Sequence, residues 1–538
     1  MTAYFNVVMY EKYRWLYKSI EKMSLNNPST EHFNWFLWGG SLVEFFMLVA
    51  IVALLLYGVW YSTSPFLRFP VLAINTLWHG VFILSISLWL LGSRFSLLPS
   101  FILFKNNLLY DDFSFKISII LVICTIVCLF LSRDFLVYEK INVFEYVIFI
   151  LLSCLGGCWL VASYDFFTMY LAIELLSLPL YALASIKSRS LLSTEAGLKY
   201  FILGAFSSGV FLFGVSLIYF ATGSLNFAET GQLFAGTSIS LLDLTQGDSS
   251  LSYVSAYLIG VIMVLVGLLF KLTAVPFHMW APDVYEGAPI SVTAFFSILP
   301  KFAVIIFCCR FFFFTFYDMF NIWQPIILST ALISIVVAAF SALYQRKLKR
   351  FLAYSSIGHV GYMLLAFGTG TSEGLQSILV YIFIYLITSI CVWSFILSLN
   401  LRKDNKNKKP FFISELNGLG VSNPLLAFTL TVIMFSIAGT PPLAGFIAKL
   451  NIFFCAIESS LFVLSFLGII TRCLSAFYYL RFIKIMYFDT SKSWTLVDKI
   501  DKDKSIFIGA SLFFLVLLFI FPSPLFILSH EIAVWVLV

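Results

Sequence analysis

Charged residues are scarce in this chain of 538 residues: Asp, Glu, Lys and Arg together make up 11%, whereas hydrophobic residues make up 61%. Both fractions lie outside the range of soluble globular proteins, and the mean hydropathy is +0.98. Water is therefore not the main solvent of this chain. The basic residues give a net charge of +6 but form no basic and aromatic binding module, so we expect no nucleic-acid partner.

Motifs that hold redox cofactors are also missing. The nine cysteines form no CxxC pair, and Cys124 and Cys128, like Cys154 and Cys158, are four residues apart within apolar runs. This spacing argues against an iron-sulfur cluster and is typical of small buried side chains. The sequence has no Gly-rich nucleotide fingerprint, no Walker loop and no paired-histidine haem pattern. We therefore predict no cofactor and no metal site in this chain, and no redox chemistry of its own.

Long apolar runs fill most of the sequence. A helix needs roughly 20 mainly apolar residues to span a bilayer, and such runs recur from Leu42 almost to Val538. They are continuous rather than alternating, which favours helices over the strands of a barrel. The sequence thus predicts an all-α polytopic membrane protein with about fourteen transmembrane helices. The expected spans are 42–61, 71–91, 117–131, 143–162, 166–186, 198–221, 254–274, 292–313, 326–344, 351–367, 378–399, 425–457, 462–482 and 506–521.

Basic loops set the expected orientation. Lysines and arginines gather at residues 187–189, 346–350, 402–409 and 492–504, each time after an odd-numbered span. These loops are expected to share one face, which the positive-inside rule identifies as the mitochondrial matrix or the bacterial cytoplasm. An even number of spans puts both termini on the opposite face. The basic stretch 1–35 does not fit this pattern, so either it escapes the short-loop rule or it hides another span.

Ionisable residues inside spans carry the functional prediction, because each costs about 2.5–3.5 kcal/mol at mid-membrane on insertion scales. Glu174 lies in MYLAIELLSLPLYAL. Lys271 in VGLLFKLTAVPFHMWAPDVYEGAP closes a long apolar run and is followed by Pro276 and His278. The alternatives are a packing contact for Glu174 and snorkelling to the interface for Lys271. A charge and an imidazole beside a helix break favour an ion-transfer site over both.

Two further lysines extend this set. Lys301 follows a proline in SILPKFAVIIF, and Lys449 follows Gly439, Pro441 and Pro442 in FSIAGTPPLAGFIAKLNIFF. The prolines predict a second broken helix just before Lys449. The two breaks occupy similar positions in two successive groups of five spans, which indicates two inverted five-helix repeats, each with a discontinuous helix.

Three weaker candidates remain. Glu195 and Lys199 are spaced i,i+4, which fits a structural ion pair and a proton-uptake site equally well. His359 in SSIGHVGYML fits helix packing about as well as a relay role.

The stretches ELLSLPLYAL, FKLTAVPFHMWAPDVYEGAP, ILPK and AGTPPLAGFIAK resemble the subunit 2 family of respiratory complex I, the NADH:ubiquinone oxidoreductase. The resemblance covers about residues 143–487, and this family is related to cation/proton antiporter subunits. It implies that Glu174 and Lys271 form the ion pair of a proton channel, with Lys301 as the central relay and Lys449 as the exit-side lysine. His278 is then an auxiliary relay between Lys271 and Lys301.

The resemblance also implies a division of the chain and a set of partners. The segments are an N-terminal extension (1–40), three helices (41–142), two antiporter-like repeats (143–313 and 314–487) and a C-terminal helix (488–538). Flavin, iron-sulfur clusters and quinone are expected in partner subunits, and the expected contacts are the other membrane-arm subunits, membrane lipids and protons. The 61 phenylalanines suggest a base-biased organelle genome and hence the mitochondrial inner membrane, with the bacterial plasma membrane as the alternative.

The predicted function is proton translocation, driven by electron transfer in other subunits. Burial penalises the charged form of a lysine and a nearby carboxylate favours it, so movement of Glu174 relative to Lys271 would switch the proton affinity of the lysine. Two alternatives stay open at this point: an antiporter subunit that exchanges Na⁺ or K⁺ for protons, and a structural membrane anchor whose buried charges only pair.

Overall fold

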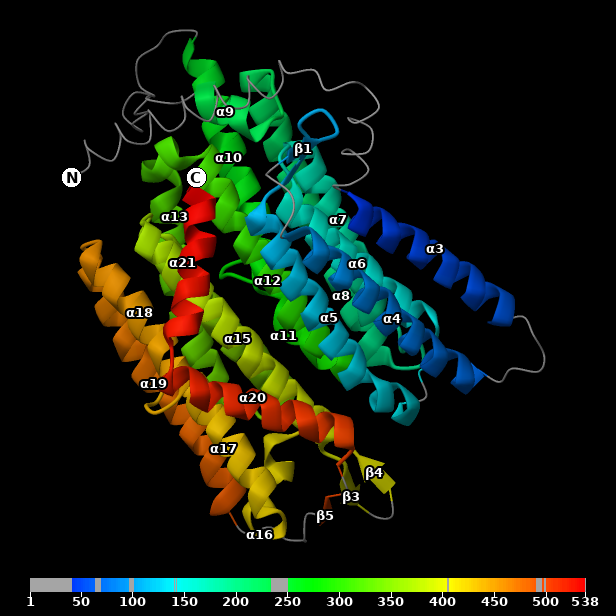
Figure 1. Cartoon of the computed structure of the whole chain (residues 1–538). Coiled ribbons are helices and arrows are strands. Elements are labelled where there is room, and N and C mark those ends of the chain that lie inside the picture. Colours follow the sequence, from blue (N-terminus) through cyan, green and yellow to red (C-terminus); the bar gives the residue numbers. More distant parts are fainter. Residues whose placement is uncertain are drawn as a thin grey trace.

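The computed structural model describes residues 41–62, 69–95, 101–139, 141, 143–233, 250–403, 406–489, 496–497 and 500–537. In this part the chain is a bundle of long α-helices (Figure 1), with α3 (Leu42–Ser62) and α4 (Phe69–Phe95) at one edge. The helices α18 (Ala444–Glu458) and α19 (Phe462–Tyr487) form the opposite edge. The extension predicted over residues 1–40 lies outside the described residues, and the other predicted segment boundaries stay predictions.

Twelve helices of the described part are long and apolar enough to cross a membrane. The helix α14 (Leu348–Phe367) and the interrupted pair α17 (Pro424–Ala438) and α18 account for the other two expected spans. The predicted all-α polytopic fold is therefore confirmed. The twelve are α3, α4, α5 (Asp112–Tyr138), α6 (Glu145–Ala162), α7 (Phe166–Ala184), α8 (Leu191–Thr222), α10 (Ser250–Leu272), α12 (Ile290–Thr315), α13 (Phe320–Tyr344), α15 (Ser372–Ser398), α19 and α20 (Lys502–Ile520).

Short elements join the long helices. They are the antiparallel hairpin of β1 (Phe101–Leu103) and β2 (Leu108–Tyr110), the sheet of β3 (Leu401–Lys403), β4 (Lys406–Lys408) and β5 (Leu496–Val497), the 3₁₀ turns η2 (Tyr317–Met319) and η3 (Ile413–Leu416), and the helices α9 (Phe227–Leu233), α11 (Trp280–Gly287), α16 (Leu419–Ser422) and α21 (Ser523–Leu537). The sequence did not predict α21, because Pro522 and Pro524 follow the last expected span directly.

The core of the bundle is built around α12, whose spanning stretch is entirely buried. Phenylalanines such as Phe295, Phe302 and Phe307 fill the space around it and leave almost no exposed surface. A helix that is apolar all round must be covered on every side, and large aromatic rings supply the buried area. The ammonium of Lys301 thus sits in the least accessible part of the molecule.

Two broken helices occur where the prolines predict them. The first ends at Leu272 and resumes at Trp280, and the second ends at Ala438 and resumes at Ala444. Thr273 (φ 64°) and Gly439 (φ 80°) adopt the left-handed conformation directly after these helix ends. Three residues later each break contains a cis peptide bond before proline, Val275–Pro276 and Pro441–Pro442. The two repeats therefore interrupt their discontinuous helices with the same backbone geometry.

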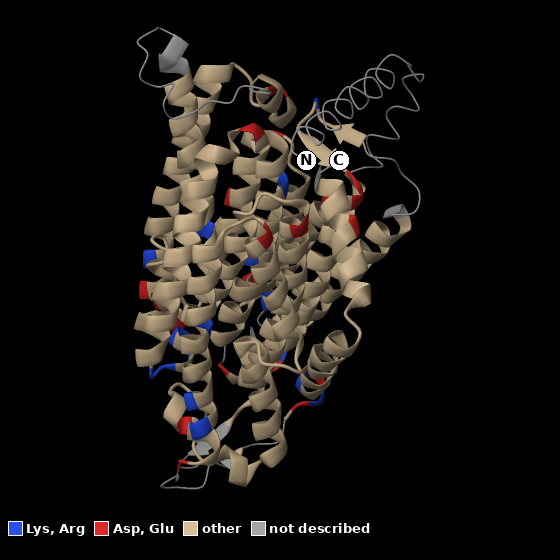
Figure 2. Ribbon diagram, turned by 90° about the vertical axis from the view of Figure 1, so that its left-hand side faces the viewer, with Lys and Arg blue, Asp and Glu red and all other residues tan. Residues whose placement is uncertain are grey.

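The basic loops meet at one end of the bundle, as the sequence predicts. Lys187 forms an ion pair with Glu139 at the end of α5, and the backbone of Lys347 pairs with that of Phe412. This end carries α16 and β3–β5 in Figure 1, while α21 ends at the other. In Figure 2 charged residues occur at both ends and at intervals along a bundle that is otherwise formed by other residues. We call the end with these loops the basic face.

Candidate functional site

The first buried lysine contacts a tyrosine. Lys271 lies in the last turn of α10 with 8% of its surface exposed, and its Nζ donates a hydrogen bond of 3.0 Å to Tyr181 Oη on α7. The same Nζ lies 5.5 Å from the centre of the Tyr181 ring. The sequence analysis did not nominate Tyr181, although it closes the motif ELLSLPLY that contains Glu174.

The implied ion pair between Glu174 and Lys271 is not formed. No salt bridge joins them in the described part of the chain, and the buried Glu174 Oε1 has no hydrogen-bond partner. Glu174 precedes Tyr181 by seven residues on α7. Seven residues are two helical turns, or about 10 Å, so the two side chains share a face of α7 at different depths. Because Lys271 ends its helix at the level of Tyr181, it bonds the hydroxyl rather than the carboxylate.

His278 lies in the first break, between α10 and α11. It is buried, and its Nδ1 has no hydrogen-bond partner. Its carbonyl accepts a hydrogen bond from Ala281, which starts the turn into α11. Among the described residues, no hydrogen bond connects its ring to Lys271 or Lys301. Its relay role stays a prediction.

The second lysine, Lys301, occupies the middle of the buried α12 with 2% of its surface exposed. Its Nζ donates a hydrogen bond of 2.7 Å to Ser356 Oγ on α14 and lies 5.6 Å from the centre of the Tyr285 ring. Among the described residues it has no acidic partner. A hydroxyl and an aromatic face are thus the polar groups that the structure gives this amine.

The helix α14 connects Lys301 to the third lysine. Ser356, His359 and Tyr362 follow each other at intervals of three residues, so they lie along one side of α14. Ser356 contacts Lys301, the ring of Tyr362 lies 5.2 Å from Lys449 Nζ, and His359 Nδ1 lies 2.7 Å from Tyr381 Oη on α15. The sequence nominated His359 but missed the serine and the tyrosine on either side of it. Their regular spacing in SSIGHVGY is the signal that could have found them.

Lys449 on α18 is 3% exposed and bonds the freed end of a helix. Its Nζ donates hydrogen bonds to the carbonyls of Ile437 (2.8 Å) and Ala438 (3.1 Å) in the last turn of α17. Arg472 on α19 donates a hydrogen bond to the carbonyl of Gly439, the next residue. The last carbonyls of a helix have no partner within it, so the break supplies the acceptors for these cations.

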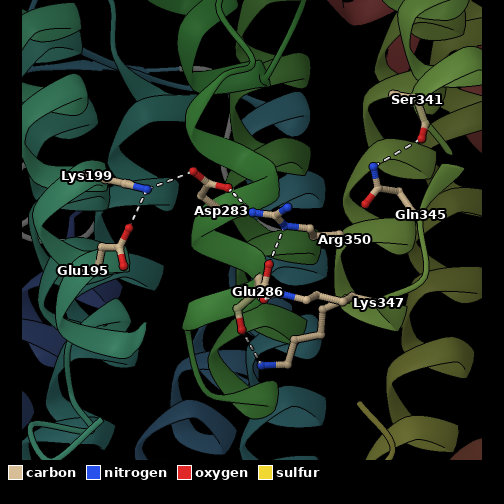
Figure 3. A network of polar contacts seen from close by, with 9 residues as sticks. Glu195, Lys199, Asp283, Glu286, Ser341, Gln345, Lys347 and Arg350 are labelled. Atoms are coloured by element: carbon tan, nitrogen blue, oxygen red, sulfur yellow. Dashed lines mark hydrogen bonds and ion pairs between the residues drawn. The ribbon is translucent and has the colours of Figure 1, made fainter. Parts of the chain in front are cut away.

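A network of ion pairs lies next to the first break (Figure 3). Lys199 on α8 pairs with Glu195 (2.7 Å) and with Asp283 on α11 (3.1 Å). Arg350 on α14 pairs with Asp283 at 2.6 Å. Arg350 and Lys347 both pair with Glu286, the most buried member of the network. The network thus joins α8 and α11 of the first repeat to α14 of the second.

The sequence nominated only two residues of this network. Glu195 and Lys199 form the predicted i,i+4 pair, but the Glu195 side chain is exposed and that of Lys199 only half-buried. The acids Asp283 and Glu286 belong to the DVYEGAP segment, to which the sequence analysis gave no role beyond its resemblance. Their cationic partners are Lys199 on α8, Lys347 just before α14 and Arg350 in its first turn. This long-range pairing follows from the packing of α11 against α8 and α14.

Comparisons with known proteins agree with this arrangement. The chain matches the family described as NADH:quinone oxidoreductase/Mrp antiporter, TM, over residues 163–475. It is 44% identical over 490 residues to NADH-ubiquinone oxidoreductase chain 2 of Marchantia polymorpha, covering 91% of this chain and 97% of that protein. It is 39% identical over 488 residues to NADH-quinone oxidoreductase subunit N of Pelagibacter ubique, covering 90% of this chain and 96% of that protein. A chain in the structure of respiratory complex I from Thermus thermophilus with bound aureothin superposes with a TM-score of 0.72 at 27% identity, covering 90% of this chain and 98% of that chain.

Proposed function

Because the chain belongs to the NADH:quinone oxidoreductase/Mrp antiporter family, as a member of its chain 2 (subunit N) branch, we propose that it moves protons along its line of buried lysines. It is a multi-pass membrane-arm subunit of complex I, in the mitochondrial inner membrane or a bacterial plasma membrane. Its partners are other membrane-arm subunits. Electron transfer is assigned to partner subunits, which hold the flavin, iron-sulfur clusters and quinone.

One observation carries the proposal: Lys271, Lys301 and Lys449 are each at most 8% exposed, and none has an acidic partner among the described residues. An isolated ammonium in an apolar interior is far costlier than a neutral amine. A structural role needs no such groups, because each could be replaced by an apolar side chain. A role in proton transfer needs amines whose charge can change.

The contacts suggest the order of transfer. Lys271 begins the line at Tyr181, and Glu174 lies two turns away along α7. A change in the distance between Glu174 and Lys271 would alter the stability of the charged lysine. The energy released by electron transfer in the partner subunits would drive this change. One proton moved against 100 mV costs about 2.3 kcal/mol, and a tenfold change in protonation is about 1.4 kcal/mol, so modest changes in charge stabilisation suffice.

The second half of the line runs beside α14. Ser356 accepts a hydrogen bond from Lys301, and Tyr362 lies against Lys449. His359 lies between these two residues and bonds Tyr381, so it is the titratable group placed to bridge the two lysines. Lys449 then releases the proton across the membrane. In this proposal His359 acts as a relay rather than a packing residue.

The two alternatives are less well supported. A cation/proton antiporter subunit shares the family description, but the relatives at 44% and 39% identity are complex I subunits. Na⁺ or K⁺ dependence of proton transport would distinguish it. A structural anchor is opposed by the distribution of the lysines over α10, α12 and α18, because charges that lock one interface need not extend through the bundle.

The test replaces Lys271 by Ala in the assembled complex and measures NADH:quinone electron transfer together with proton transport. We expect both to fall, since transfer through other subunits is coupled to this one. Lys484→Ala is the matched control, because Lys484 is an exposed lysine near the end of α19 and lies outside the line. Normal proton transport by an assembled Lys271→Ala complex would refute the proposal.

A further inference from the structure

A cavity of about 440 Å³ opens at the basic face, away from the buried lysines. Its walls come from the end of α13, the start of α14, the end of α19, and the start of η3 with the residue before it. Two arginines, Arg346 and Arg481, line it together with the polar side chains of Gln345 and Ser414. The other lining residues are aliphatic or aromatic, so the cavity combines a cationic rim with apolar walls.

The backbone holds one wall of this cavity in place. Ile413 N donates to Arg346 O and Leu348 N donates to Phe411 O, each at 3.0 Å. These bonds tie the loop before α14 to the segment before η3 as a short antiparallel pair. The cavity is therefore part of the fixed structure at this end of the bundle.

The two arginines differ from their neighbours in their pairing. Lys347 and Arg350 both form ion pairs with Glu286. Among the described residues no ion pair with an acid involves Arg346 or Arg481; Arg481 Nη1 donates one hydrogen bond of 2.8 Å to Leu343 O. A guanidinium has five donors, so most of those on both arginines are left for an anion. Phosphate oxygens match this geometry through paired hydrogen bonds.

The apolar surroundings indicate what carries the anion. Phe351 and Phe482 stack at 5.9 Å inside the cavity. On the outer surfaces of the two packed helices α13 and α19, Phe340, Tyr344 and Phe477 are more than half exposed. We propose that the cavity binds the phosphate headgroup of an anionic phospholipid, with an acyl chain along α13 and α19. Basic pockets between helices on the matrix or cytoplasmic side are suited to such headgroups.

The test compares lipid retention by purified complexes. The variant Arg346→Gln/Arg481→Gln removes both cations from the cavity, and Arg189→Gln/Lys502→Gln removes two exposed cations of the same face that do not line it. After detergent washing, mass spectrometry of extracted lipid should show less anionic phospholipid in the first variant only, while Arg346→Lys/Arg481→Lys should keep most of it. Equal retention by the two glutamine variants would overturn the proposal.

Two further measurements separate the ligand sources. Inorganic phosphate at millimolar concentration should not displace the lipid, because it lacks the acyl chain; displacement would assign the cavity to free anions instead. A phospholipid with a photoreactive acyl chain should label peptides from α13 and α19 in the unmodified complex, which also covers the case that the glutamine variant does not assemble. Protection of the cavity by an acidic segment of a neighbouring subunit, with no lipid labelling, would contradict the proposal.

Discussion

Replacement of Tyr181 by Phe isolates the contact at the start of the lysine line. The change removes one oxygen, the acceptor of the 3.0 Å hydrogen bond from Lys271 Nζ, and keeps the ring that lies 5.5 Å from this amine. The phenylalanine fits the same space, because no atom is added. Any effect on function therefore reports the hydroxyl.

The magnitude follows from the charge of the donor. A hydrogen bond to a charged group contributes about 1.5–3 kcal/mol, so its loss makes the charged form of Lys271 about ten- to a hundredfold less favourable relative to the neutral form. Tyr362 offers a matched control in the second repeat. Lys449 lies against its ring but donates its hydrogen bonds to Ile437 O and Ala438 O, so removal of the Tyr362 hydroxyl should change transport little.

The assay is the rate of NADH-driven proton transport, measured in proteoliposomes containing the assembled complex. We expect Tyr181→Phe to lower coupled turnover by about tenfold or more and Tyr362→Phe by much less than that. Added to Lys271→Ala, Tyr181→Phe should cost nothing further, because the partner of the hydroxyl is already gone. Full turnover by Tyr181→Phe, or equal losses in the presence and absence of Lys271, would refute the role assigned to this bond.

Three further predictions concern stability. Glu286→Gln removes the buried carboxylate shared by Lys347 and Arg350. The loss in folding stability is about 1–3 kcal/mol after allowance for the partly exposed cations. The variant should lower the melting temperature of the complex more than Glu195→Gln at the exposed end of the network. Gly445→Ala places a Cβ 1.9 Å from the Ser436 carbonyl oxygen and should block assembly on native gels, whereas Gly509→Ala meets no atom within 4 Å and should assemble normally. Burial, with Lys504 nearby, lowers the pKa of Lys409 in the loop before η3 from 10.5 to about 7. Between pH of about 7 and 10.5 the unfolded chain therefore binds one more proton than the folded chain, so the melting temperature should rise with pH over this range. In Lys409→Met the melting temperature should depend less on pH over the same range.

Much of the fold follows from local features of the sequence. Apolar run length specified the spans, and Pro276 and Pro442 marked the two breaks, because proline cannot continue a helix. The helix α21 was missed for the same reason: Pro522 and Pro524 indicate an end, although Pro522 only separates two helices and Pro524 lies in the first turn of the second. Such a restart depends on packing against α15 and α5, which no local pattern reveals.

The candidate site was less predictable, because its contacts join residues that are far apart in the chain. A single lysine in an apolar run is conspicuous because placing its charge inside the membrane is energetically unfavourable. Lys271, Lys301 and Lys449 could be nominated for this reason. Their partners do not stand out: Tyr181 and Ser356 are ordinary residues of mainly apolar helices until the fold brings an amine to them. The implied ion pair is not formed because Glu174 and Lys271 lie at different positions along α7. Their relative position depends on where α10 ends beside α7, which the sequence does not show.

The two helix breaks have the same backbone conformation, but one lysine precedes its break in the sequence and the other follows it. Lys271 comes two residues before the left-handed Thr273, whereas Lys449 comes ten residues after the left-handed Gly439. Each amine nevertheless lies near a tyrosine ring on the second helix of its own repeat, 5.5 Å from Tyr181 on α7 and 5.2 Å from Tyr362 on α14.

The difference in polar partners separates the roles of the two ends. Lys449 bonds the carbonyls of Ile437 and Ala438, whose dipoles stabilise an ammonium but accept no proton from it. Lys271 bonds a hydroxyl, which both donates and accepts hydrogen bonds and so suits an amine in either charge state. We infer that Lys271, with Glu174 two turns away, is where the protonation state is switched, and that Lys449 holds a proton until the field across the membrane or a neighbouring group removes it.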